Sequence, residues 1–200
     1  MRLKEKISII TGAASGFGKG IAKKFSEEGA KLILADINKD LLEKVSKDLN
    51  QDFFYTDVAN SSSMLELSKY VLKKYGTIDI MINNAGITHL PKPLEEVSEE
   101  EFDKIFAVNS KSVYLCGKFF VPHMKKQKKG VILNISSTAG ISPRPNLNWY
   151  NATKGWMITA TKAMAVELAP FNIRVNSLAP VAGETPLLKS FLGEDTPERR

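Results

Sequence analysis

The sequence predicts a three-layer α/β fold in which a doubly wound parallel sheet lies between two layers of helices. Short runs rich in β-branched residues alternate along the chain with longer amphipathic segments, an alternation typical of β-α-β units. Several of the short runs are almost entirely apolar, as expected for strands that are covered on both faces. The length of 200 residues and the hydrophobic content of 43% fit a single domain, residues 1–200, with a sizeable core.

The expected elements alternate from the N-terminus onward. The apolar runs predict strands at Lys6–Thr11, Lys31–Asp36, Asp52–Tyr55, Ile78–Asn83, Gly130–Ser136 and Ile173–Leu178. The amphipathic segments predict helices near Gly18–Glu28, Lys39–Leu49, Ser61–Tyr75, Glu99–Lys126 and Tyr150–Ala169. Ligands of such sheets bind beyond the carboxyl ends of the strands, so functional residues should lie there or on the following helix.

The formal net charge of +6 and the pI near 9.3 would suit a nucleic-acid-binding protein, but the placement of the charges does not. The chain has 23 lysines and five arginines, and the lysines stand beside acidic residues along the expected helices. The densest run, at residues 125–129, precedes Gly130, where a helix should end and cations stabilise its dipole. Aromatic residues do not alternate with these charges, so we expect no nucleic-acid partner.

Three features of the sequence bear on its compartment. The longest apolar stretches fall far short of the roughly 18 residues of a membrane-spanning helix. The first residues, MRLKEKISIITG, lack the cleavage site of a signal peptide. Cys116 is the only cysteine and cannot form an internal disulfide, which favours a reducing compartment. We therefore expect a cytoplasmic protein with no membrane partner.

The turn after the first expected strand is rich in glycine. It reads Thr11-Gly12-Ala13-Ala14-Ser15-Gly16-Phe17-Gly18, and a helical pattern follows at once. These glycines would let backbone N–H groups approach a diphosphate at the helix N-terminus, where the helix dipole favours anions. A mononucleotide P-loop would need Gly at position 13 and Ser or Thr at position 20, where the chain has Ala13 and Gly20. A plain connecting turn remains the alternative to a dinucleotide site.

The second expected strand ends at Asp36, 18 residues after Gly18. A carboxylate at this distance can accept hydrogen bonds from the ribose hydroxyls of adenosine and would repel a 2′-phosphate, which favours NAD over NADP. The alternative for Asp36 is a simple turn residue or an N-cap of the helix that follows. Asp57 and Val58 follow the third strand, and Asn84, Ala85 and Gly86 follow the fourth, so both groups belong to the edge where the adenosine should lie.

Three of the five tyrosines have a lysine four residues later, so this spacing alone carries little information. Only Tyr150 and Lys154 open a helix after an expected strand, and Ser137, at the end of that strand, lies 13 residues before Tyr150. Residues four apart share one helix face. A cation there would favour the phenolate of a tyrosine, whose ordinary pKa of about 10 makes it a poor base.

A metal-dependent alcohol oxidation is not expected. His89, His123 and Cys116 are the only His and Cys residues, and two of them are seven residues apart on one helical pattern. They cannot assemble a zinc site of the alcohol-dehydrogenase kind, so the sequence predicts no metal site.

Together, these motifs resemble those of the short-chain dehydrogenase/reductase family, in the branch of 3-oxoacyl-carrier-protein reductases and many alcohol and polyol dehydrogenases. The matches are TGxxxGxG at Thr11–Gly18, NNAG at Asn83–Gly86, Asn109 in the expected helix Glu99–Lys126, SSxxG at Ser136–Gly140, YxxxK at Tyr150–Lys154, and Asn176 with Pro180. They occur in order from residue 6 to about residue 190, and together they are far more specific than any one of them. The resemblance implies a Rossmann-like fold and an oxidoreductase that acts on CH–OH groups.

The resemblance also implies a catalytic tetrad of Asn109, Ser137, Tyr150 and Lys154. In the family, the tyrosine exchanges a proton with an alcohol or ketone oxygen as hydride moves to or from the nicotinamide, and the serine holds that oxygen. The lysine binds the nicotinamide ribose, and the asparagine helps to hold a water in a proton relay. The alternative for Asn109 is a structural hydrogen bond to the backbone.

The implied cofactor site comprises Gly12, Ser15, Gly16, Phe17, Gly18, Asp36, Ile37, Asp57, Val58, Asn84, Ala85, Gly86, Tyr150, Lys154, Pro180 and Thr185. Neither Ser15 nor Ile37 is basic, which again favours NAD, with NADP the less favoured cofactor. After Pro180 the family usually has Gly, whereas this chain has Val181 and then Gly183, so the turn beside the nicotinamide should be shaped differently.

The expected substrate is a small alcohol or ketone, with a 3-oxoacyl thioester as one candidate. Residues 87–95, Ala139–Trp149 and Leu187–Leu192 should line its pocket. Within these ranges, Trp149, Leu147, Ile141 and Leu188 should make it partly apolar, although each could equally pack within a loop. Arg144 is interpreted as a surface residue rather than an anion site. The family commonly pairs through the helices expected here at Glu99–Lys126 and Tyr150–Ala169, so a homodimer or homotetramer is expected.

Family members usually have about 250 residues. We therefore expect the chain to lack the family's last strand and helix, and its end, Gly193–Arg200, to lie in the mobile substrate lid. The alternative to an active enzyme is then a catalytically impaired NAD-binding or structural partner protein.

Overall fold

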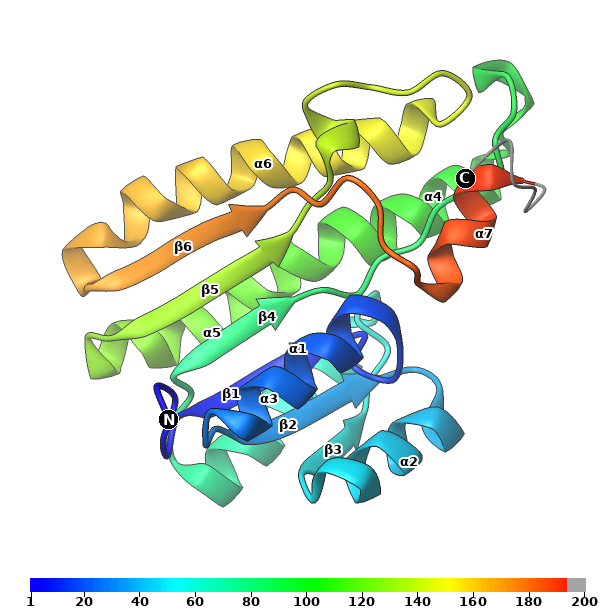
Figure 1. Ribbon diagram of the computed structural model, residues 1–200. Helices are drawn as coiled ribbons and strands as arrows, with labels where there is room; N and C mark the ends of the chain where they lie inside the picture. The colour runs from blue at the N-terminus through cyan, green and yellow to red at the C-terminus, as the bar shows by residue number, and fades with distance from the viewer. Residues whose placement is uncertain (194–200) are drawn as a thin grey trace.

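The computed structural model describes residues 1–193, which form a six-stranded parallel sheet covered by helices on both faces (Figure 1). The strands, in the order β3-β2-β1-β4-β5-β6 across the sheet, are β1 (Ile7–Thr11), β2 (Lys31–Asp36), β3 (Asp52–Tyr55), β4 (Ile80–Asn83), β5 (Gly130–Ile135) and β6 (Ile173–Leu178). The helices are α1 (Gly16–Glu27), α2 (Lys39–Leu49), α3 (Ser61–Tyr75), α4 (Glu99–Phe106), α5 (Ser112–Gln127), α6 (Asn148–Leu168) and α7 (Pro186–Leu192). All strand pairs are parallel, which confirms the predicted doubly wound fold.

Two apolar cores hold the three layers together. On one face of the sheet, α1 and α2 pack over the outward side chains of β1, β2 and β4, with Ile10 and Leu34 fully buried. On the other face, α3, α5 and α6 pack over Ile9, Met81 and Ile132. Residues on both faces of β1 and β2 are therefore apolar, which explains why these strands show continuous hydrophobic runs rather than an alternating pattern.

Local signals explain where the helices begin and end. Asn38 and Asn60 are the N-caps of α2 and α3, and each side-chain oxygen accepts a backbone N–H three residues later at 3.1 Å. Ser98 and Glu101 form a reciprocal capping box at the start of α4. Gly76 ends α3 in the left-handed conformation, with φ +71°.

The strand order reverses between β1 and β4, so a crevice opens at the carboxyl ends of these two strands. Near this crevice, side-chain amides join β4 to β5 and β5 to α6. Asn83 donates to Asn134 at 2.8 Å, and Asn134 donates to the hydroxyl of Thr161 at 2.8 Å. These fully paired buried groups set the position of α6 relative to the sheet.

The structure differs from the expected elements in two places. The predicted single helix at residues 99–126 is interrupted by a π-helical turn, Ala107–Lys111, which connects α4 to α5 and contains Asn109. Residues 186–192, for which no element was predicted, form α7. Among residues 1–193, no helix is long and apolar enough to cross a membrane. The expected lid beyond Gly193 lies outside the described residues.

Candidate active site

One cavity of about 480 Å³ lies at the carboxyl ends of the strands, between α1 and α7. It is lined by fifteen of the sixteen expected cofactor residues, all but Gly18. Ser137 lines it as well, so three of the four expected catalytic residues face the same space as the glycine-rich turn. A volume of several hundred cubic ångströms is typical of a pocket for a small molecule or cofactor.

The glycine-rich turn at the start of α1 is tightly packed against the end of β4. Gly12 has φ +64°, a conformation that glycine adopts without strain. A Cβ at Gly18 would lie 2.0 Å from the Gly12 carbonyl oxygen, so only glycine fits where α1 approaches the turn. This explains why Gly18 supports the site without lining the cavity.

Thr11 and Asn84 brace this turn. The Asn84 side chain donates to the carbonyl oxygens of Thr11, at 2.8 Å, and Gly12, at 3.1 Å. The Thr11 hydroxyl accepts the backbone N–H groups of Asn84 and Ala85 at 3.0 and 3.1 Å. The Asn84 amide is therefore engaged within the protein, a structural role that the motif alone did not reveal.

Asp36 closes the far end of the cavity. Its carboxylate accepts the backbone N–H of Ala14 at 3.0 Å and that of Asn38 at 2.9 Å. The N-cap of α2 is Asn38, so Asp36 is not the cap. Its bond from the N–H of Asn38, two residues later, is instead that of a turn aspartate, the other alternative that the sequence left open. Two backbone donors orient the carboxylate toward the cavity wall that Ile37, Asp57 and Val58 share.

Asn109 is fully buried and lies beside the cavity rather than in it. Its amide donates to the Ile87 carbonyl at 2.9 Å and to the Thr153 hydroxyl at 3.0 Å, and its oxygen accepts the Ile87 N–H at 2.9 Å. Asn109 therefore joins the loop after β4 to α6. This geometry matches the structural alternative that the sequence left open for this residue.

Lys154 is buried one helical turn after Tyr150. Its ammonium nitrogen donates to the Ile135 carbonyl at the end of β5, at 2.9 Å, and lies 5.7 Å from the centre of the Tyr150 ring. Burial lowers the pKa of Lys154 to about 8. A Cβ at Gly86 would lie 3.3 Å from this nitrogen, so the glycine leaves room for the lysine beside β4.

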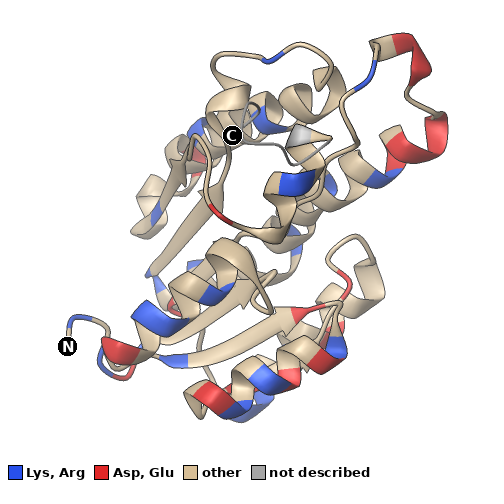
Figure 2. Cartoon of the chain, turned by 45° about the vertical axis from the view of Figure 1, so that its right-hand side comes forward, with Lys and Arg blue, Asp and Glu red and all other residues tan. Residues whose placement is uncertain are grey.

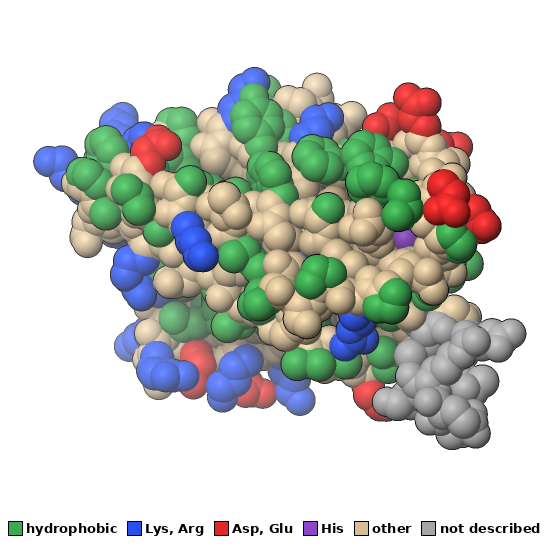
Figure 3. All heavy atoms as spheres, turned by 90° about the horizontal axis from the view of Figure 1, so that it is seen from above, with side chains coloured by type: hydrophobic (Ala, Val, Ile, Leu, Met, Phe, Trp, Pro, Cys, Tyr) green, Lys and Arg blue, Asp and Glu red, His purple; other side chains and the backbone are tan. Residues whose placement is uncertain are grey.

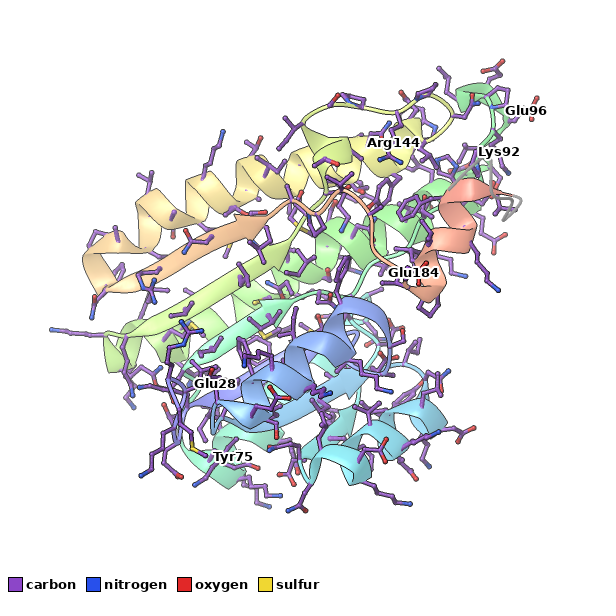
Figure 4. All side chains as sticks on the ribbon, in the orientation of Figure 1. Glu28, Tyr75, Lys92, Glu96, Arg144 and Glu184 are labelled. Carbon is purple, nitrogen blue, oxygen red and sulfur yellow. The ribbon has the colours of Figure 1, made fainter. Side chains whose placement is uncertain are left out.

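Burial raises the pKa of the Tyr150 phenol above its ordinary value of 10.0, and this effect outweighs the lowering by the Ser137 hydrogen bond and by the Arg144 charge. Burial therefore opposes the phenolate that a cation at Lys154 would favour, and the role of Tyr150 as general acid and base stays a prediction. Arg144 lies beside the N-terminal end of α6 (Figure 4). The Ser137 oxygen also accepts the Ala139 N–H at 3.1 Å, which orients it at the end of β5.

The substrate end of the cavity differs from the sequence expectation. Leu188 lines it, but Trp149, Leu147 and Ile141 do not. Trp149 instead donates to the Leu94 carbonyl at 3.2 Å and packs edge-on against Phe102. Leu147 is buried below the loop, and Ile141 is exposed.

Lining residues without a signal in the sequence include Lys104 and Val108 from the α4 region. Phe191 lies in the range Leu187–Leu192, which was expected to line the pocket, and it lines the cavity together with Leu187 and Leu188. The ring centres of Phe191 and Tyr150 lie only 5.0 Å apart. Their positions depend on where α4 and α7 fold back over the sheet, which local patterns do not specify.

Comparison with known proteins identifies the family. The model of the family described as short chain dehydrogenase matches residues 6–195. The chain belongs to the short-chain dehydrogenase family. As a short-chain dehydrogenase, it is an oxidoreductase that acts on CH–OH groups, and the resemblance drawn from the motifs is confirmed.

Individual relatives span most of this short-chain dehydrogenase. A 4-formylbenzenesulfonate dehydrogenase of Comamonas testosteroni is 38% identical, with 100% of this chain and 82% of the relative covered. A 3-oxoacyl-[acyl-carrier-protein] reductase of Thermotoga maritima is 41% identical, with 96% and 79% covered. The crystal structure of a 3-ketoacyl-(acyl-carrier-protein) reductase from Brucella melitensis, complexed with NADH, is 46% identical and superposes with a TM-score of 0.92, over 94% of this chain and 80% of that one.

Among residues 1–193, no three His, Cys, Asp or Glu side chains are grouped so that they could hold a metal ion.

Cys116 is fully buried, and burial raises the pKa of its thiol to about 12. It is therefore a core residue without nucleophilic character at neutral pH.

Proposed function

We propose that this protein is an NAD(H)-dependent oxidoreductase that interconverts a secondary alcohol and a ketone by hydride transfer, with Tyr150 as the general acid and base. The observation that carries the proposal is that one cavity is lined by all the groups this chemistry needs. Asp36 supplies a carboxylate suited to the ribose of adenosine, and Ser137 and Tyr150 supply the hydroxyls for the reacting oxygen. The Brucella relative bound to NADH lends support, because its fold superposes on this one over 94% of the chain.

The cavity residues fit a dinucleotide. Gly12 and Gly18 approach each other closely because neither carries a side chain. The N-terminus of the twelve-residue helix α1 therefore stays open to a diphosphate. Asp36 presents a carboxylate suited to the ribose hydroxyls and unsuited to a 2′-phosphate, so NAD is preferred to NADP. Lys154 and Thr185, both in the cavity wall, would hold the nicotinamide end.

The proposed chemistry assigns one task to each side chain. The bound nicotinamide supplies hydride to a ketone carbon or accepts it from an alcohol carbon. Tyr150 holds the proton that it donates to the ketone oxygen, and it accepts that proton again in the reverse direction. Ser137 donates a hydrogen bond to the same oxygen and keeps it within reach of the phenol. Lys154 supplies positive charge beside the phenol, and Asn109 positions the Ile87 segment against α6.

A 3-oxoacyl thioester is a second candidate substrate. The observation in its favour is the similarity to two reductases named for 3-oxoacyl or 3-ketoacyl groups on acyl carrier protein. A panel that includes 3-oxoacyl thioesters, simple ketones and secondary alcohols separates the two possibilities.

Self-association through α5 and α6 belongs to the same proposal. Tyr114 on α5 and Trp156 and Val166 on α6 are exposed apolar side chains, and Val166 is 80% exposed. Figure 3, which looks onto α6 from the side away from the sheet, shows further apolar side chains on this face. Sedimentation should give a homodimer or homotetramer that Val166→Glu dissociates.

The distribution of Lys and Arg over several helices argues against a nucleic-acid partner (Figure 2). The proposed compartment is the cytoplasm.

The decisive experiment follows NADH absorbance with the substrate panel. Tyr150→Phe should abolish turnover of every active substrate while NADH binding persists. Tyr114→Phe is the matched control, because it removes a hydroxyl from another Tyr–Lys pair outside the cavity. NADH binding without any turnover by the unsubstituted protein would support the impaired-enzyme alternative instead, and failure to bind NADH would refute both.

A further inference from the structure

Phe191 is the aromatic side chain that α7 places against the general acid and base. Its ring centre lies 5.0 Å from that of Tyr150, with the two planes 65° apart, and it lines the cavity. A molecule that brings an oxygen to the Tyr150 hydroxyl must therefore contact Phe191 or displace it. The contact places this side chain in the substrate site of the proposed function.

Two loops on opposite sides of the cavity determine where α7 begins. The Pro180 carbonyl accepts the Thr138 N–H at 3.0 Å, which ties the segment before α7 to the loop that carries Ser137. Gly183 packs against the ring of Phe17, so closely that a Cβ there would lie 2.5 Å from the ring. The segment is thus fixed both to the catalytic loop and to the glycine-rich turn.

The first turn of α7 is fixed in the same way. Thr185 lies against Gly16, where a Cβ would be 3.2 Å from the threonine side chain, and Pro186 occupies the first helical position. The Leu188 N–H donates to the Thr185 carbonyl at 3.0 Å. One further turn along the helix brings Phe191 to Tyr150, so the position of the ring follows from contacts on the described chain.

Phe191 does not resemble a core phenylalanine. Phe120, on the core side of α5, is fully buried, whereas Phe191 is only partly buried and faces the cavity. Leu187 and Leu188 line the cavity from the same helix. This end of the cavity therefore offers apolar surface next to the phenol, and a polar substituent placed against it would lose its hydrogen bonds to water.

We propose that Phe191 is a specificity-determining residue, which selects ketones and secondary alcohols that carry an apolar alkyl or aryl group on the reacting carbon over hydroxylated ones. This inference rests on the proposed function, because it assigns the substrate side of the same cavity. An aryl or alkyl group gains contact with the edge or face of the ring. A hydroxymethyl group in the same place gains no partner from it.

The test compares kcat/KM for acetophenone and hydroxyacetone with NADH in the unsubstituted protein, Phe191→Ala and Phe191→Leu. The unsubstituted protein should prefer acetophenone. Phe191→Ala should lower the ratio of the two values about tenfold or more, because apolar contact in a pocket is worth that much discrimination. Phe191→Leu retains apolar volume and should change the ratio less. The ratio is independent of the amount of active enzyme, so partial unfolding of a variant does not alter it.

Phe102→Ala is the matched control, since Phe102 also packs edge-on against an aromatic ring, that of Trp149, but away from the cavity. Its ratio should equal that of the unsubstituted protein. A preference for hydroxyacetone, or a ratio that Phe191→Ala leaves unchanged while ketones are still reduced, overturns this inference and leaves the proposed function intact. Reduction of no ketone by the unsubstituted protein overturns the proposed function and this inference with it.

Discussion

The Lys154 ammonium nitrogen lies 5.7 Å from the centre of the Tyr150 ring, yet it donates its hydrogen bond to the Ile135 carbonyl at 2.9 Å. The four-residue spacing places both side chains on one face of α6, and on this face the lysine is buried against the end of β5. Burial then moves both pKa values toward the neutral forms: that of Lys154 falls to about 8 and that of Tyr150 rises.

Because burial disfavours its charged form, Lys154 lowers the free energy of unfolding at neutral pH. The unfolded chain keeps the lysine proton up to its ordinary pKa of 10.5, whereas the folded protein releases it above about 8. The unfolded state therefore binds more protons between these values, and the free energy of unfolding should rise with pH across this range.

Replacement of Lys154 by Met should consequently stabilise the ligand-free protein while it abolishes turnover. The pKa difference corresponds to about 3 kcal/mol at pH 7, and loss of the Ile135 hydrogen bond offsets about 1 kcal/mol of it. Urea unfolding at pH 7 and at pH 10 measures the effect, which should shrink at the higher pH. Lys118→Met, at an exposed lysine of another Tyr–Lys pair, should show neither change. A loss of stability at pH 7 would contradict the burial argument.

The raised pKa of Tyr150 predicts different pH profiles for the two directions of reaction. At neutral pH the phenol keeps its proton, so ketone reduction should be level across this range. Alcohol oxidation needs the phenol to accept a proton, so its kcat/KM should rise with pH from 7 toward 10. Initial rates with NADH and NAD measure both profiles. An oxidation rate that is already level at pH 7 would show that the phenol is more acidic than inferred.

Ser137→Ala gives an independent check on the same group. The Ser137 hydrogen bond lowers the pKa of Tyr150, so its removal should move the oxidation profile to higher pH. It should also lower kcat about 100-fold, because a hydrogen-bond donor to the reacting oxygen is lost. Ser142→Ala, in the adjacent exposed loop, should leave the profile unchanged. A lower kcat with an unshifted profile would limit Ser137 to contact with the substrate.

Much of the fold follows from local signals in the sequence. Helices α2 and α3 and the strand β6 have the predicted bounds because caps, glycines and apolar periodicity mark their ends. The cavity-lining residues were also predictable as a group, since they stand at the carboxyl ends of parallel strands.

The sequence alone did not determine contacts between distant segments. Trp149 was expected in the pocket, but it packs against Phe102 of α4 and donates to the carbonyl of Leu94, in the turn before that helix. The amide of Asn84 could serve a ligand or the turn, and only the folded chain shows that it braces Gly12. Phe191 meets Tyr150 because the segment from Pro180 onward crosses the cavity, and no local pattern encodes that crossing.

Asp36 should determine the preference between the two nicotinamide cofactors. Asp36→Ala removes the carboxylate and its bonds to the Ala14 and Asn38 N–H groups, so NADH affinity should fall about tenfold or more. NADPH affinity should fall less, since repulsion of the 2′-phosphate also disappears, and the NADH/NADPH affinity ratio should shrink. Fluorescence titration measures both constants. Asp40→Ala, on the exposed side of α2, is the control, and an unchanged ratio in Asp36→Ala would argue against the assignment of Asp36.

Gly18 and Gly20 provide a matched test of the glycine-rich turn, because they lie two residues apart on α1 in opposite surroundings. A Cβ at Gly18 would meet the Gly12 carbonyl oxygen at 2.0 Å and the Asn84 side-chain nitrogen at 2.5 Å, whereas nothing lies within 4 Å of one at Gly20. Gly18→Ala must therefore push α1 away from the turn, which should prevent NADH binding and lower the free energy of unfolding by about 1–3 kcal/mol.

Gly20→Ala should do the opposite. Alanine is favoured over glycine inside a helix, so this variant should gain about 0.5–1 kcal/mol of stability and bind NADH as before. Thermal unfolding and NADH titration of both variants measure the two effects side by side. Equal losses of binding in the two variants would mean that general disturbance of α1, rather than the close contact of Gly18 with Gly12 and Asn84, governs the site.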